Sequence, residues 1–243
     1  MYDLKTFTQE NMYDCAIALR NMNAGAKSME DMANQIVRYL HSSLIDQHSG
    51  TPACALVRFF KTHAYKGLDP ELQDAAQAIL KGRSIVGATK CLTLLATAGD
   101  EPYWNSRRKS MGHQAIPLMD EDFVRRAPMI LQLIQQFGLD VSTVIDTAPT
   151  LITDIERTTF NVFYVPEAYN SPYIPAQREF VIPYQIQSVL GFGGMLSTGD
   201  LFAIILFSKI SISPATANLF KWIAAYVRIP TASFAQENVF GAS

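Results

Sequence analysis

The sequence lacks the features that mark several large functional classes. Its 243 residues carry 20 basic and 22 acidic side chains, so no basic excess exists to attract a nucleic-acid backbone or an anionic membrane surface. No apolar run approaches the roughly 20 residues that a bilayer-spanning helix needs. The polar, acidic N-terminus (MYDLKTFTQEN) also lacks the layout of a secretion signal. We therefore expect a cytoplasmic protein with no membrane span and no nucleic-acid partner.

Cysteine is scarce. Cys15, Cys54 and Cys91 cannot all pair with one another, and none belongs to a CxxC motif. Free, buried thiols in a reducing compartment are the simplest interpretation. For Cys91, which lies in the apolar run CLTLLAT, we expect a small buried hydrophobe rather than an attachment point for a bilin.

Catalytic signatures are absent as well. The chain contains no GxSxG, HExxH, P-loop or calcium-loop motif, and its GlyPheGlyGly stretch lacks the Lys-Ser/Thr that phosphate binding would require. The four histidines are too dispersed to predict a metal site. We expect no metal and no catalytic residue in this stretch of chain, and the sequence leaves any cofactor unknown.

Two long apolar runs near the C-terminus are the clearest structural signal. SVLGFGGML and LFAIILFSKI flank a Ser-Thr-Gly-Asp link, which predicts a hairpin, and the second run is apolar enough to be a central strand. Phe202 and Ile205 should therefore be core residues, and close backbone packing should explain the glycines of the first run. Ser213 before Pro214 then predicts the start of a helix through residue 228.

Weaker signals divide the rest of the chain. Apolar periodicity and turn residues predict helices over 4–23, from 28 to about 48, 69–80 and 120–137, the last split or kinked at Pro128. They predict strands over 53–60, 91–97 and 160–165 and from 179 onward, a short helix within 141–159, and a loop over 166–175. Pro230 should interrupt the final helix, and the residues after it show no packing pattern of their own.

The residues 188–227 resemble the closing hairpin and helix of GAF domains. SMEDMANQIVRYLHSSL followed by CALVRFF is similar to the opening helix and first strand of that family. The resemblance covers about 28–228 and extends to the N-terminal input region of bacterial hybrid sensor histidine kinases. Two features depart from the family: GlyGlyMet at 193–195 replaces a usual proline, and the 98–160 segment is longer than a compact GAF domain requires.

This resemblance implies an α+β fold, with about six antiparallel strands flanked by helices and an enlarged middle insertion. It implies three parts: an N-terminal dimer or signalling helix at 1–27, a GAF-like sensory domain at 28–229, and a tail at 230–243 that links to an output domain. The implied function is small-molecule sensing that is relayed to a two-component output domain, with no catalysis by this fragment. A ligand-free dimerisation or scaffold module and a haem- or bilin-based sensor remain open alternatives.

Four side chains are candidates for the ligand site: Trp104, Arg107, His113 and Tyr164. An indole and a phenol offer flat apolar contacts, while a guanidinium and an imidazole can fix polar groups of a ligand. In a GAF-like arrangement we expect these four to line one cavity between the sheet and the 98–137 segment. The terminal helices 4–23 and 214–228 should lie together on the opposite face and favour a homodimer. The identity of the ligand cannot be read from the sequence.

Overall fold

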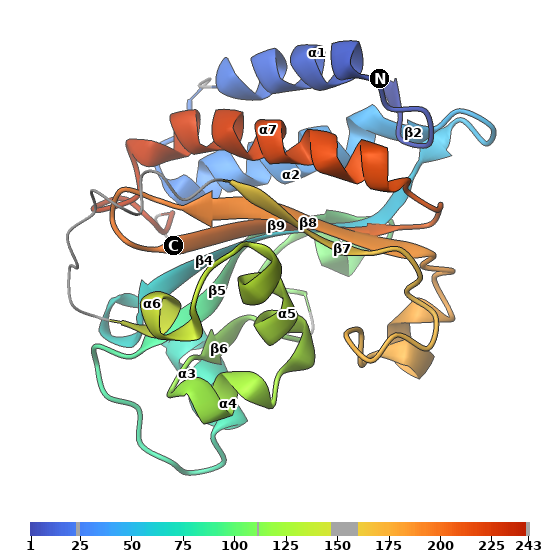
Figure 1. The fold of residues 1–243 in the computed structure, drawn as a ribbon. Helices are drawn as coiled ribbons and strands as arrows, with labels where there is room; N and C mark the ends of the chain where they lie inside the picture. The colour runs from blue at the N-terminus through green and yellow to red at the C-terminus, as the bar shows by residue number, and fades with distance from the viewer. Residues whose placement is uncertain (23–24, 111, 147–159, 242–243) are drawn as a thin grey trace.

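A computed structural model describes residues 1–22, 25–110, 112–146 and 160–241 of the chain. Its centre is a six-stranded, fully antiparallel sheet with the order β6-β5-β4-β9-β8-β7, and helices lie on both faces (Figure 1). This is the α+β architecture expected of a GAF-like domain, so the predicted fold class is confirmed.

The sheet has two central strands, β4 and β9, with two further strands on either side. The strands are β4 (Cys54–Ala64), β5 (Lys90–Gly99), β6 (Ala115–Pro117), β7 (Asn161–Val165), β8 (Ser188–Met195) and β9 (Leu201–Ser208). As predicted, β8 and β9 form a hairpin, and Phe202 and Ile205 are buried. A Cβ atom added at Gly193 would lie 2.1 Å from the carbonyl oxygen of Phe202, so close backbone packing does explain this glycine.

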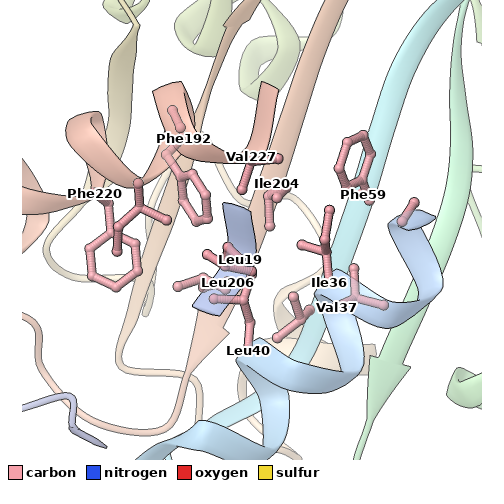
Figure 2. Close-up of a cluster of buried hydrophobic side chains, with 14 of the residues drawn as sticks. Leu19, Ile36, Val37, Leu40, Phe59, Phe192, Ile204, Leu206, Phe220 and Val227 are labelled. Carbon is pink, nitrogen blue, oxygen red and sulfur yellow. The ribbon is translucent and has the colours of Figure 1, made fainter. Parts of the chain in front are cut away.

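We call the side of the sheet covered by the two longest helices the upper face. Helix α2 (Met29–Ser43) lies over β4 and β5, and α7 (Pro214–Ala232) lies over β7 and β8. Helix α1 (Gln9–Arg20) packs against α7, so the two terminal helices lie together as predicted (Figure 1). Aliphatic and aromatic side chains from the sheet and all three helices form one continuous core between them (Figure 2).

The N-terminal residues are part of this core. The short strand β1 (Tyr2–Asp3) pairs with β2 (Leu44–Asp46), which in turn pairs with β3 (Thr51–Pro52). Thr8 caps α1 through a reciprocal hydrogen bond with Asn11, so the helix begins later than predicted.

The opposite, lower face is covered by short helices. They are a 3-10 turn at Pro102–Asn105, α4 (Glu121–Arg125), α5 (Pro128–Gln136) and α6 (Val141–Ile145). Pro128 splits the predicted 120–137 helix, as expected, because it begins α5 at a position that needs no N–H donor. Much of the segment predicted as a short helix within 141–159 lies outside the described residues. Helix α3 (Pro70–Ile79), which follows the 3-10 turn Tyr65–Gly67, packs beside β6.

The structure corrects three predictions about loops and ends. Residues from 179 do not re-enter the sheet, because Gln177–Val181 forms a π-helical turn and Pro183 cannot donate to a strand ladder. Pro230 does not interrupt α7, which continues to Ala232; only two helical residues follow the proline, so the packing of the preceding turns outweighs the one N–H donor that it lacks.

The third correction concerns the tail. The backbone oxygens of Asn238 and Val239 accept hydrogen bonds from the N–H groups of Met29 and Glu30, at 2.7 and 2.9 Å. The tail therefore accepts the hydrogen bonds of the first two N–H groups of α2, which have no partner within the helix. Val239 is buried in the upper-face core.

Among the described residues, no helix is long and apolar enough to cross a bilayer. Cys15, Cys54 and Cys91 are free and buried, as predicted, and burial raises the pKa of each thiol to about 12.

Candidate functional site

Trp104 lies on the lower face within an aromatic cluster. It is 5% exposed, and its ring centroid lies 4.5 Å from that of Tyr184 and 5.6 Å from that of Phe180. Phe180 in turn contacts Phe207 of β9 at 4.9 Å. These four side chains, which we call the aromatic wall, join the 3-10 turn at 102–105 to the loop between β7 and β8.

Arg107 is the centre of an ion-pair network. Its guanidinium donates to both carboxylate oxygens of Glu30, at 2.6 and 3.0 Å, and to Asp69 at 2.5 Å. The ring of Phe240 lies 5.6 Å from the guanidinium carbon, and Gly241 N–H donates to Glu30. Arg107 thus ties together α2, the start of α3 and the C-terminal tail, with its charge already balanced by two carboxylates.

Tyr164 belongs to the other side of the sheet. Its side chain packs against the upper-face core, and its hydroxyl donates to the carbonyl oxygen of Ile212. Its strand neighbour Phe163 points into the lower-face core, since successive side chains alternate along β7. Trp104 and Tyr164 therefore lie on opposite faces, and the four candidates do not line one cavity. The expectation of a shared cavity is wrong because it had assigned Tyr164 to the wrong face.

His113 is exposed, but it lies close to a buried cation. Partial burial, and then the positive charge of Arg58, lower the pKa of its imidazole. Arg58 itself is 9% exposed, and its Nη2 donates to Ser110 Oγ at 2.8 Å. Burial lowers the pKa of Arg58 to about 10. We call Arg58, Thr97, Ser110 and His113 the polar centre.

Arg58 occupies the middle of the lower face. It lies on β4, one of the two central strands, between cross-strand neighbours Thr97 on β5 and Ile205 on β9. Direct cross-strand neighbours point to the same face, and Ile205 belongs to the lower-face core. A guanidinium therefore stands where an apolar side chain would otherwise complete the core, and Arg is rarely buried to this extent unless it is paired.

The hydroxyl of Thr97 adds a second polar group to the same row. Thr97 is fully buried, and its Oγ1 has no hydrogen-bond partner among the described residues. An unsatisfied buried hydroxyl costs about 1–3 kcal/mol, and native proteins contain few of them. Because Thr97 lies directly beside Arg58, the polar centre contains both a cationic donor and a hydroxyl that has no hydrogen-bond partner among the described residues.

The described residues on either side of position 111 are joined by hydrogen bonds beside the polar centre. The side-chain amide of Gln114 donates to the carbonyl oxygens of Arg107 and Ser110, at 3.1 and 3.0 Å. Ser110 is thereby fixed over Arg58, while Arg107 on the same loop is anchored to α2 and α3. The loop 106–114 thus links the polar centre to the ion-pair network.

A separate surface depression lies at the far end of the sheet. It measures about 660 Å³, is open to solvent, and is lined by the β7–β8 loop and Ser211. None of the four predicted site residues lines it. Among the described residues, no group of three His, Cys, Asp or Glu side chains could hold a metal ion.

The sequence reasoning missed Arg58. The residue was visible as the only charged side chain in the apolar run CALVRFF. A charge inside a strand that is apolar on both sides is the signal that could have identified it, because such a strand is expected to be buried on both faces.

Comparison with protein-family models and with curated proteins gives no match. Among solved structures, the chain is similar to the chromophore-binding domain of Stigmatella aurantiaca phytochrome P1, with 8% identity, a TM-score of 0.39 and 95% of this chain covered. It is equally similar to a variant of the S. aurantiaca bacteriophytochrome domain in the Pr state, with 8% identity, a TM-score of 0.39 and 96% covered. The chain spans 62% of the length of each of these solved chains. Both of these solved chains are described as chromophore-binding domains. The fold class of the present chain follows from the strand order described above.

Proposed function

We propose that this domain is a sensory module that binds a small molecule at the polar centre of the lower face. The observation that carries the proposal is the buried guanidinium of Arg58 beside the unsatisfied hydroxyl of Thr97. Both groups are polar, fixed by the sheet, and placed where core packing alone would favour apolar side chains.

The chemistry of these groups indicates the class of ligand. A guanidinium matches the two oxygens of a carboxylate or the oxygens of a phosphate, and the hydroxyl of Thr97 can donate to the same group. Phe207 of the aromatic wall lies two positions along β9 from Ile205, the cross-strand neighbour of Arg58, and on the same face, and an aromatic wall suits a flat ring. A small anion with an aromatic or heteroaromatic ring fits this combination, with His113 at the solvent side.

The predicted site residues take different parts in this proposal. His113 belongs to the polar centre and Trp104 to the aromatic wall of the same face, and both remain proposed ligand-binding residues. Arg107 is proposed to act on ligand binding through the 106–114 loop, because its own charge is paired with Glu30 and Asp69. Tyr164 points to the upper face, so its proposed role is to respond to the ligand through β7 rather than to touch it.

We propose that the ligand state is relayed to a signalling output through the terminal helices, in a homodimer. The 106–114 loop connects the polar centre to α2 and to the tail through Arg107, Glu30 and Gly241. A change at Ser110 can therefore shift the elements that follow α7 without a change in the sheet. The alternative is a module that dimerises without binding any ligand.

A haem or bilin sensor finds less support in the residues of this chain. Covalent bilin attachment needs a nucleophilic thiolate, and all three cysteines are buried with pKa values raised to about 12. For haem, His113 is the candidate axial ligand in the polar centre, but the positive charge of Arg58 acts on its imidazole and would also act on a bound iron cation. An absorption spectrum of the purified protein tests both, because either group would add a visible band.

The binding proposal is tested by mass spectrometry of small molecules released on denaturation. The wild-type protein and the Arg58→Met variant are purified in parallel, with Arg125→Met as a control for an exposed arginine on α4. We expect a carboxylate or phosphate compound from the wild type and from Arg125→Met, and its loss from Arg58→Met. A thermal-shift screen with inorganic phosphate, benzoate, indole-3-acetate and AMP provides a second readout. The proposal would be contradicted if all three proteins released the same compounds. It would also be contradicted if none of them released a compound and no tested ligand shifted the Tm. Either result would favour the ligand-free module.

A further inference from the structure

We infer that the outward face of α7 is a helix–helix seam that binds the same face of a second copy in parallel orientation. This inference rests on the proposed homodimer and specifies its surface and its direction. The observations that carry it are the spacing, exposure and charge of the residues on this one helix.

The outward residues of α7 follow a heptad pattern. Their spacing alternates between three and four positions along the whole helix, as in the a and d positions of a coiled coil. In order they are Ala215, Asn218, Trp222, Ala225, Ile229 and Ala232. The seam, as we call this set, spans about 26 Å at 1.5 Å per residue.

The seam is turned away from the domain core. Phe220, Ile223 and Val227 are buried against the sheet, while Trp222 and Ile229 are 58% and 51% exposed. An amphipathic surface helix should present polar residues to water on this side. Here the exposed side contains a tryptophan, an isoleucine, three alanines and one asparagine, and no charge.

The seam can accommodate a second helix closely. Alanines at 225 and 232 leave space for the larger side chains of a facing helix, so Trp222 and Ile229 can insert between them as knobs. A single asparagine at position 218 can pair with its own copy and define the register, as a lone polar residue does in coiled-coil seams. The face is therefore complementary to itself, which a two-fold dimer requires.

The charges beside the seam select the parallel direction. The positions on one flank hold Lys221 and Arg228, and those on the other flank hold Leu219 and Tyr226. In an antiparallel pair the two basic flanks would face each other, and like charges would repel. In a parallel pair each basic flank meets the opposite flank of the partner, which places Lys221 near Tyr226 of the second copy. That contact allows a cation–π interaction.

Cysteine cross-linking tests the direction. The native cysteines are all buried, so a single cysteine can be introduced at either end of the seam in the otherwise unchanged protein. We expect Ala215→Cys and Ala232→Cys each to form a disulfide-linked dimer with itself under mild oxidation. A mixture of the two variants that cross-links only between 215 and 232 would instead establish an antiparallel pair and overturn the inference.

Light scattering and sedimentation test the surface. We expect Ile229→Glu to raise the dimer dissociation constant by at least about tenfold, since a charge would be buried in the seam. Ile182→Glu is the matched control, because Ile182 is also 51% exposed but lies in the β7–β8 loop. A wild-type dimer that both variants leave intact would place the interface elsewhere, and overturn this inference but not the proposed homodimer. A wild-type monomer at high micromolar concentration would overturn both, while the ligand experiment would be unaffected.

Discussion

Replacement of Thr97 by valine should make the protein more stable and less able to bind its ligand. The Thr97 hydroxyl is fully buried and has no hydrogen-bond partner among the described residues. Valine has nearly the same shape and removes only the desolvated hydroxyl, so the substitution should recover about 1–3 kcal/mol. For a chain of this length each kcal/mol corresponds to about 2–4 °C in Tm, which is readily measured.

Thr93→Val provides the matched control on the same strand. Thr93 is also fully buried, but its hydroxyl donates to the carbonyl oxygen of Cys91 at 3.1 Å. Its loss should therefore cost about 0.5–1.5 kcal/mol, so the two valine variants should move in opposite directions in urea unfolding and in Tm. If Thr97→Val lowered stability by as much as Thr93→Val, the Thr97 hydroxyl would be satisfied in the native protein and the polar centre would lose its main support.

Three further outcomes follow from the structure. Arg107→Ala should cost about 3 kcal/mol in urea unfolding, because it leaves the carboxylates of Glu30 and Asp69 without their cation. Ile205→Ala should cost about 2–5 kcal/mol, and a loss below ~0.5 kcal/mol would contradict its central position on β9. Burial and the charge of Lys61 lower the pKa of His63 from 6.5 to about 4, so the unfolded chain binds the proton more readily than the folded chain. The contribution of His63 to the free energy of unfolding should therefore be complete above pH 6.5 and decline as the pH falls towards 4. His63→Gln should flatten that decline.

Much of the fold could be predicted because the relevant signals are local. The hairpin at 188–208, the helix start at Ser213 and the division at Pro128 each depend on a few neighbouring residues with fixed backbone preferences. The docking of the tail could not be predicted, because it depends on N–H groups at the start of α2 that lie some 210 positions away in the sequence. The sequence of residues 233–241 has no apolar periodicity from which this contact could be predicted.

The site was only partly predictable for a related reason. The sequence singled out Trp104 and His113 from a loop rich in aromatic and basic residues, and the structure places Trp104 in the aromatic wall of the lower face and His113 near Arg58. It assigned Tyr164 to the same cavity, but alternation along a strand does not say which of two neighbours faces which layer. The ion pairs of Arg107 depend on contacts with Glu30 and Asp69, which lie 77 and 38 positions away in the sequence. The position of Arg58 depends on the strand order, which places β4 beside β9.

That strand order also constrains how the chain can fold during synthesis. β4 and β5 are made early and can pair at once, yet the other edge of β4 is completed only by β9, whose first residue lies 137 positions beyond the end of β4 (201 against 64). Until then an apolar strand with unpaired backbone groups is open to other chains. We therefore expect slow, topology-limited folding and a nascent species prone to aggregation, protected mainly by the charge of Arg58 and Lys61 within that edge.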